Sequence, residues 1–110
     1  MPELPEVART AMSLNNAVQG SELSEVIIHS GRYSRHGDPI GLEELRKEFP
    51  IKVNSVQFYG KLIVFEFSNK ENKKWWCWNT LGMSGGWRYD QTKHSHVEFK
   101  TSKGSVFFTD

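Results

Sequence analysis

The sequence predicts a mostly β, α+β fold: an antiparallel β-sandwich with an N-terminal helix and a second short flanking helix. Three observations support this fold class. Apolar residues recur at helical spacing only near the N-terminus and around residues 42–49, whereas short β-type segments separated by turn residues fill the second half. Aromatic residues make up 13% of the chain, which favours a packed core over disorder. The length of 110 residues is that of one small domain.

The first predicted element is a helix over residues 4–20. Pro5 suits the first helical turn, Glu3 and Glu6 favour its positive end, and Gly20 can end it. One apolar stripe at helical spacing would dock this helix on the rest of the protein and hold the N-terminus in place. The stripe consists of Val7, Ala11, Leu14 and Val18.

The later elements are predicted to be mainly strands. A strand over residues 22–30 precedes a loop over residues 31–39, and a short helix over residues 42–49 is closed by Pro50. From residue 51 onward nearly all signals are β, with turn residues between short segments, so six to eight antiparallel strands are expected in total. The strands expected in this part cover residues 51–58, 61–68, 75–81, 87–90, 96–101 and 105–110.

Charge and cysteine content limit the choice of function. The net charge is +1, but residues 1–50 carry five basic and eight acidic side chains, whereas residues 51–110 carry nine and five. An anion-binding surface is therefore expected to draw mostly on the second half, with Arg32 and Arg35 adding to it. Cys77 is the single cysteine. It has no disulfide partner within the chain, and no apolar segment has the length of a membrane span or the pattern of a signal peptide. We therefore expect an intracellular protein.

The first residues offer a candidate nucleophile. If Met1 is removed, Pro2 becomes a secondary amine, and α-amino groups have a reference pKa of about 7.7 to 8.0, so a useful fraction is neutral. Such an amine can attack a carbonyl-like carbon and form an iminium, while Glu3 could move protons at the same centre. Taken alone, however, these residues are more simply explained as the start of a helix.

Three later segments offer weaker signals. Lys61 follows a glycine at an expected hairpin turn, where a solvated lysine is the default interpretation and a phosphate contact the alternative. Met83 lies in the glycine-rich segment 82–86, which is most simply a tight turn with the methionine packed inward. His94 and His96 would share one face of a strand. A structural role is favoured for them, then a phosphate contact, then a metal site, because no further ligands are supplied.

The tryptophan-rich segment is expected to be structural. Trp75, Trp76 and Trp78 are interpreted as the core and rim of a strand pair, and Cys77 as buried and inert. No chemistry is assigned to them.

Taken together and in order, these fragments resemble the N-terminal catalytic domain of the formamidopyrimidine-DNA glycosylase family, which is related to endonuclease VIII. The resemblance covers the whole chain, so residues 1–110 are expected to form that domain. The helix-two-turn-helix and zinc-finger domain of the family is absent from these residues. The motifs that carry the resemblance are MPELPEV at the start, GR at 31–32, GK at 60–61, LGMSG at 81–85, KHSHVEF at 93–99 and the final TD.

The resemblance implies base-excision repair chemistry: a DNA glycosylase with abasic-site lyase (β-elimination) activity on oxidised bases, with oxidised purines preferred. Pro2 would form the Schiff base, Glu3 would act as acid and base, and Lys61 would contact phosphate and assist catalysis. Glu6 would lie at the lesion pocket, and Met83 would fill the gap left by the extruded nucleotide. The residues expected to contact DNA are Arg32, Met83, Lys93 and His94.

The resemblance also implies partners and a location. The partner would be double-stranded DNA with an oxidised base or an abasic site, in the cytoplasm or at the nucleoid and not at a membrane. No cofactor is expected in this chain, since the zinc site of the family lies in the C-terminal region. Because that region supplies most phosphate contacts, these residues alone are expected to be weakly active or inactive. Self-association through the face that the other domain normally covers is a further hypothesis.

Two alternatives stay open. One is a non-catalytic β-sandwich module that binds DNA or protein. The other concerns processing: if Met1 is retained, the Pro2 nitrogen is an amide and cannot form the covalent intermediate.

Overall fold

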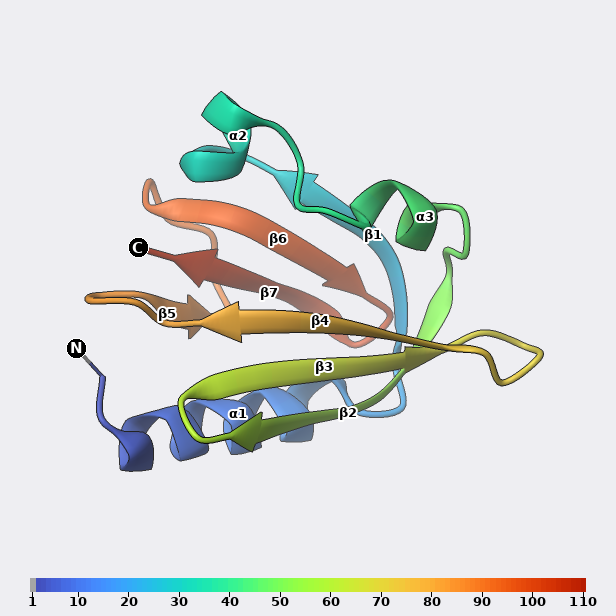
Figure 1. Cartoon of the computed structure of the whole chain (residues 1–110), viewed down its shortest axis with the longest axis horizontal. Helices are drawn as coiled ribbons and strands as arrows, with labels where there is room; N and C mark the ends of the chain where they lie inside the picture. Colours follow the sequence, from blue (N-terminus) through green and yellow to red (C-terminus); the bar gives the residue numbers. More distant parts are fainter. Residues whose placement is uncertain (1) are drawn as a thin grey trace.

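The computed structural model describes residues 2–110, which contain one long helix, two short helices and seven strands (Figure 1). The fold class predicted from the sequence, mostly antiparallel β with a few helices, is confirmed. The elements are α1 (Leu4–Val18), β1 (Glu22–Ile28), α2 (Arg32–His36), α3 (Leu42–Arg46), β2 (Ile51–Tyr59), β3 (Leu62–Ser68), β4 (Lys74–Thr80), β5 (Gly86–Arg88), β6 (Ser95–Thr101) and β7 (Gly104–Thr109).

The strands form one antiparallel sheet in the order β4-β3-β2-β1-β6-β7-β5. The centre of this sheet is narrow, because β1 pairs with β2 only through Glu22↔Lys52 and Leu23↔Ile51, and its remaining length pairs with β6. A junction of two residue pairs allows the sheet to fold over at this point. The result is two layers, β2–β3–β4 and β1–β6–β7–β5, that remain hydrogen bonded to each other through the junction.

Aromatic contacts show that the two layers face each other. Phe65 on β3 lies 5.0 Å from Phe99 on β6 and 5.3 Å from Trp87 on β5, measured between ring centroids. In the sheet order, β3 is separated from both of these strands, so the contacts must cross the space between the layers. The core of the sandwich is therefore a cluster of aromatic rings between the layers.

Helix α1 packs its apolar stripe against the same core. Val7, Ala11, Leu14 and Val18 are all buried, as the helical spacing predicts. In addition, the side-chain oxygen of Asn15 accepts a hydrogen bond from the backbone N–H of Val56 on β2, at 2.8 Å. The stripe and this bond fix α1 along β2 and so determine where the N-terminus lies.

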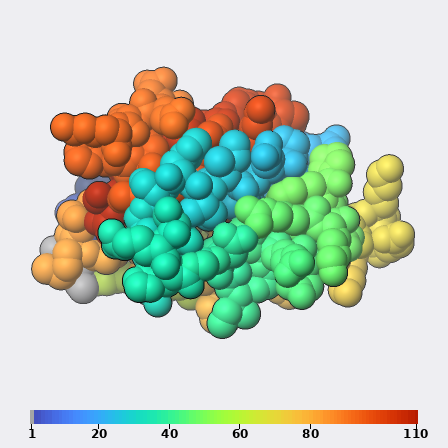
Figure 2. All heavy atoms as spheres, turned by 90° about the horizontal axis from the view of Figure 1, so that it is seen from above, coloured from blue at the N-terminus to red at the C-terminus, as the bar shows by residue number. Residues whose placement is uncertain are grey.

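The structure differs from the sequence prediction in the region before β2. The segment predicted as a loop, 31–39, contains the short helix α2, and the predicted helix 42–49 is shorter, ending at Arg46. Helix α2 has no buried residue, so no apolar periodicity could indicate it. Figure 2 shows the segments that hold α2 and α3, teal and green, side by side on one face of the molecule.

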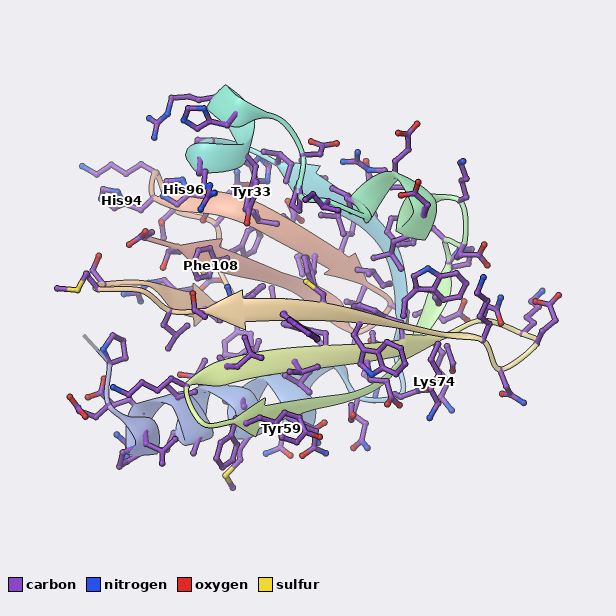
Figure 3. All side chains as sticks on the ribbon, viewed as in Figure 1. Tyr33, Tyr59, Lys74, His94, His96 and Phe108 are labelled. Atoms are coloured by element: carbon purple, nitrogen blue, oxygen red, sulfur yellow. The ribbon has the colours of Figure 1, made fainter. Side chains whose placement is uncertain are left out.

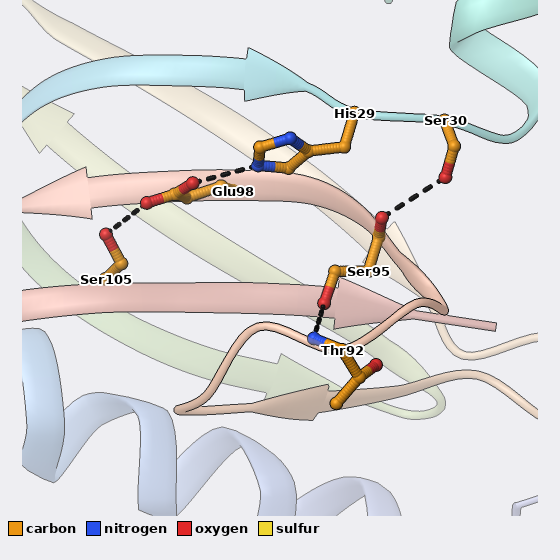
Figure 4. A network of polar contacts seen from close by, with 6 residues as sticks. All are labelled: His29, Ser30, Thr92, Ser95, Glu98 and Ser105. Atoms are coloured by element: carbon orange, nitrogen blue, oxygen red, sulfur yellow. Dashed lines mark hydrogen bonds and ion pairs between the residues drawn. The ribbon is translucent and has the colours of Figure 1, made fainter.

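A polar network joins β6 to its neighbours β1 and β7 (Figure 4). Glu98 on β6 accepts a hydrogen bond of 2.5 Å from the hydroxyl of Ser105 and lies 2.9 Å from Nε2 of His29. Burial raises the pKa of Glu98, but the hydrogen bonds from Ser105 and His29 and the charge of His29 outweigh burial, so its pKa lies below the usual value of 4.5. The carboxylate is thus stabilised in the folded state.

Because the pKa of Glu98 is lowered on folding, its contribution to stability is present above about pH 4.5 and is lost as the pH falls through the folded value. Replacement of Ser105 by alanine should therefore cost about 1 to 2 kcal/mol near neutral pH and progressively less in acid. Urea unfolding between about pH 3 and about pH 7 measures this difference. Ser24→Ala is the matched control, since Ser24 bonds a backbone carbonyl, and its cost should not change with pH. A Ser105→Ala cost that is independent of pH would contradict the prediction.

Candidate active site

The N-terminus of α1 places Glu3 at the surface. Glu3 has an extended backbone, and its carbonyl accepts hydrogen bonds from the N–H groups of Glu6 and Val7, at 3.0 and 3.1 Å. Glu3 is therefore the residue at which the helix begins, and its side chain, 73% exposed, projects into solvent. Pro2 lies immediately before it and is partly buried. The interpretation of this segment as a helix start is confirmed.

The hairpin between β2 and β3 brings Lys61 to the same place. Tyr59 pairs with Leu62, and Gly60, with φ of 58°, provides the left-handed conformation that the tight turn needs. Nζ of Lys61 lies 3.9 Å from Oε2 of Glu3. The two residues are far apart in the sequence and meet because α1 is docked along β2. An ammonium group and a carboxylate thus flank the end of the chain where Pro2 lies.

The turn between β4 and β5 presents Met83. Leu81 and Gly85 close this turn with a hydrogen bond of 2.7 Å between the Gly85 N–H and the Leu81 carbonyl. Met83 is 74% exposed, so the expectation of an inward-packed methionine is wrong. In addition, Ser84 donates a hydrogen bond of 2.8 Å to the carboxylate of Asp110. The turn is therefore fixed to the residue that follows β7, while its methionine remains in solvent.

His94 and Lys93 lie in the turn that precedes β6, and both are exposed. The prediction that His94 and His96 share a strand face is wrong, because β6 begins only at Ser95. The backbone N–H of His94 donates to the hydroxyl of Thr92 at 3.1 Å, which holds the turn. The His94 ring is left at the surface (Figure 3).

His96 has the structural role that the sequence favoured for it. Nδ1 lies 2.8 Å from the hydroxyl of Ser30, and Nε2 lies 3.2 Å from the carbonyl of Asp110. Gly31 sits so close that a Cβ there would lie 2.7 Å from Nδ1, so a larger residue does not fit without a shift. Since Gly31 leads directly into α2, His96 fixes the segment that carries the exposed Arg32.

The candidate residues gather at one end of the molecule. Figures 1 and 2 show the N-terminal segment and the orange turns around β5 at the same end of the long axis. Hydrogen bonds through Asp110 and His96 connect the Met83 turn to the Arg32 segment at this end. Glu6, in the first turn of α1, is exposed here as well. The structure thus brings Glu3 and Lys61 into direct contact, links the Met83 turn to the Arg32 segment through hydrogen bonds, and places the other candidates only at the same end.

Among residues 2–110, no group of three or more His, Cys, Asp or Glu side chains could hold a metal ion. Within the same residues, no helix has the length and apolar character needed to cross a membrane.

Burial raises the pKa of Cys77 to about 11, so its thiol stays protonated at neutral pH, in line with the predicted inert role.

The chain is similar to known proteins in both sequence and fold. A family model of the formamidopyrimidine-DNA glycosylase N-terminal domain matches residues 1–110. The chain is 32% identical over 96% of its length to a formamidopyrimidine-DNA glycosylase of Pelobacter propionicus, and 30% identical over 100% to one of Photorhabdus laumondii. It also matches the structure of MutM in complex with DNA containing carbocyclic 8-oxo-G, with a TM-score of 0.78 and 26% identity over 99% of its length.

All three relatives are much longer. The chain spans 39% and 40% of the two glycosylases and 41% of the MutM chain.

Proposed function

Since the chain belongs to the formamidopyrimidine-DNA glycosylase family, whose N-terminal domain it matches over residues 1–110, we propose that it forms the catalytic part of a base-excision repair enzyme. The proposed activity is DNA glycosylase with abasic-site lyase, on oxidised purines in double-stranded DNA. The observation that carries the proposal is the approach of Lys61 to Glu3, 3.9 Å apart beside Pro2. This pair supports the proposal because it sets an ammonium group and a carboxylate next to the residue proposed as the nucleophile.

The proposed chemistry begins at Pro2. Its amine attacks the anomeric carbon of the damaged nucleotide, the bond to the base breaks, and the base leaves with that electron pair and a proton. The nitrogen loses its proton, and its electron pair then breaks the bond from the anomeric carbon to the ring oxygen, which takes up a proton, so that the opened sugar stays joined to Pro2 as an iminium. Loss of a proton from the neighbouring carbon then expels the phosphate on the 3′ side with the electron pair of its C–O bond. Glu3, at the surface beside this centre, transfers protons, and Lys61 holds a phosphate next to it.

This chemistry requires a free amine at Pro2. Met1, which would have to be removed, lies outside the residues 2–110 that the structure describes. We propose that the active form lacks Met1 and that the form retaining it cannot make the iminium, because an amide nitrogen has no nucleophilic electron pair.

The same end of the molecule is proposed to hold the DNA. Met83, 74% exposed on a turn closed by a backbone hydrogen bond, would enter the base stack when the damaged nucleotide is extruded, a step that costs a few kcal/mol. Arg32, Lys93 and His94 would contact phosphates, which positions DNA without reading its sequence. DNA as a partner is supported by the MutM relative, which was solved with DNA containing carbocyclic 8-oxo-G. Glu6 would line the lesion pocket.

No cofactor is proposed for residues 1–110, and the domain is proposed to act with the further part that the longer relatives contain. Self-association of the isolated domain stays a prediction, which sizing chromatography tests directly.

Borohydride trapping on a duplex with one abasic site tests the function. The Met1-processed chain should give a covalent adduct, the Met1-retaining chain should give none, and Pro2→Gly, which replaces the secondary amine by a primary one, should form the adduct far more slowly. Glu3→Gln should slow its formation by about 10²- to 10⁴-fold, the usual contribution of a general acid–base. Glu43→Gln, another exposed glutamate in the first turn of a helix, is the matched control and should react normally. An equal adduct in Pro2→Gly, or no adduct with processed protein at high concentration, would instead favour the non-catalytic module.

A further inference from the structure

The outer face of the β2–β3–β4 layer carries exposed aromatic side chains that the proposed catalytic site does not use. Trp76 and Trp78 on β4 are 56% and 72% exposed, and Tyr59 at the end of β2 is 66% exposed. They border a groove of about 360 Å³. Its remaining lining residues are Ser55, Gln57, Leu62, Val64 and Glu66. The interpretation of these tryptophans as core and rim therefore fails for Trp76 and Trp78.

The strand register explains how this face is built. Trp78 lies opposite Val64, and Trp76 lies opposite Glu66. Residues two apart on a strand point to the same face at a separation of about 7 Å, so each tryptophan offers its own ring to solvent. Val64 and Leu62 form an apolar floor between the rings and β2. Such a floor with separated rings on a sheet resembles the stacking platforms that bind single-stranded nucleic acids.

Lysines surround the aromatic side chains. Lys52 and Lys74 form one row across the layer, since each pairs with Ser68, and Lys61 lies at the opposite end in the β2–β3 turn. Figure 3 shows Tyr59 and Lys74 toward opposite ends of the layer. Across residues 51–80 there are five lysines and two glutamates. The end of this face that holds Lys52 and Lys74 is therefore positively charged.

The single carboxylate in the groove does not reverse this charge. Glu66 accepts a hydrogen bond of 3.0 Å from Asn54, and the ammonium of Lys74 lies 3.8 Å from it. A polyanion therefore fits this face. A second copy of the chain fits less well, because two such faces in contact would bring lysines against lysines.

We propose that this aromatic face, formed by Tyr59, Trp76 and Trp78 with Lys52 and Lys74, binds single-stranded DNA. Bases stack on the rings and phosphates contact the lysines. The surface is separate from Pro2 and Glu3, and binding there needs neither a lesion nor a covalent step. It goes beyond the proposed function by adding a second nucleic-acid contact, which would hold an unpaired strand near the repair site.

Fluorescence anisotropy with an undamaged oligo-dT strand tests this proposal on the 110-residue chain. Trp78→Ala and Trp76→Ala should each weaken binding by roughly 5- to 100-fold, because one stacked base is lost. Trp78→Phe should restore most of the affinity, since a ring remains. Lys74→Ala should reduce the slope of log affinity against log salt concentration by about one, because one phosphate contact is lost. Ile40→Ala, at a fully exposed apolar residue between α2 and α3, is the control and should bind normally.

The outcomes separate this proposal from the catalytic one. Pro2→Gly should bind oligo-dT like the unmodified chain, whereas Trp78→Ala should still be trapped on an abasic duplex. Unchanged oligo-dT affinity in both tryptophan variants would overturn the proposal. So would sedimentation showing a dimer that Trp76→Ala and Trp78→Ala convert to monomer, with no oligo-dT binding, because the face would then be a self-association surface.

Discussion

Replacement of Phe65 by alanine is expected to lower the free energy of unfolding by about 3 to 5 kcal/mol, the usual cost of a buried phenylalanine. Phe65 is 1% exposed and contacts rings from both layers. It stacks on Phe67 within β3 and touches Trp87 and Phe99 across the sandwich. Loss of its ring would leave a cavity that these rigid neighbours cannot fill by moving, since each is held by its own strand.

Urea unfolding followed by circular dichroism measures this effect, and Phe58→Ala is its matched control. Phe58 lies on the neighbouring strand of the same layer but is 37% exposed, so its truncation should cost markedly less. Equal costs for the two variants would mean that the layers do not pack through Phe65. The two-layer arrangement would then be wrong.

Features of the fold that depend on nearby residues could be predicted from the sequence. The apolar stripe of α1 is a local pattern, and so is the hairpin at Gly60 and Lys61, because turn residues separate two β-type segments there. The strand that carries Trp75, Trp76 and Trp78 was likewise predicted from its local pattern. That pattern could not show which face would be covered, because coverage depends on how the sheet folds over.

Features that depend on distant residues could not be predicted. Ile27 on β1 pairs with Glu98 on β6, although the two residues are far apart in the sequence. No local sequence pattern predicts such a pairing. The approach of Lys61 to Glu3 likewise requires α1 to dock along β2 first. A structural role was favoured for His96, but its partners Ser30 and Asp110 could not be identified, because they lie far from it in the sequence. The resemblance identified candidate residues, but it did not identify the contacts that fix their positions.

A second large effect is expected at Gly85, in the turn that carries Met83. A Cβ at this position would lie 2.2 Å from the carbonyl oxygen of Leu81 and 3.0 Å from the ring of Phe108. The first contact is with backbone, and the same oxygen accepts the Gly85 N–H at 2.7 Å. The turn therefore cannot relax without losing the bond that closes it. Gly85→Ala should cost about 2 to 3 kcal/mol through strain and the lost hydrogen bond.

Gly86 is a close control for this substitution, because a Cβ there would meet nothing within 4 Å. Gly86→Ala should change stability by less than about 0.5 kcal/mol, and it should leave Met83 in place. If thermal and urea unfolding showed Gly85→Ala to be as stable as Gly86→Ala, the closed turn would be contradicted.

Displacement of the turn also has a functional consequence that depends on the substrate. Under the proposed function, Met83 offsets the cost of extruding a nucleotide, and that cost is lower where the base is already missing. Gly85→Ala should therefore slow excision of an oxidised purine more than it slows borohydride trapping on an abasic duplex, whereas Gly86→Ala should affect neither. Equal slowing of both reactions would mean that Gly85→Ala acts by unfolding the domain or disturbing Glu3 and Lys61. Met83 would then have no separate role in the gap.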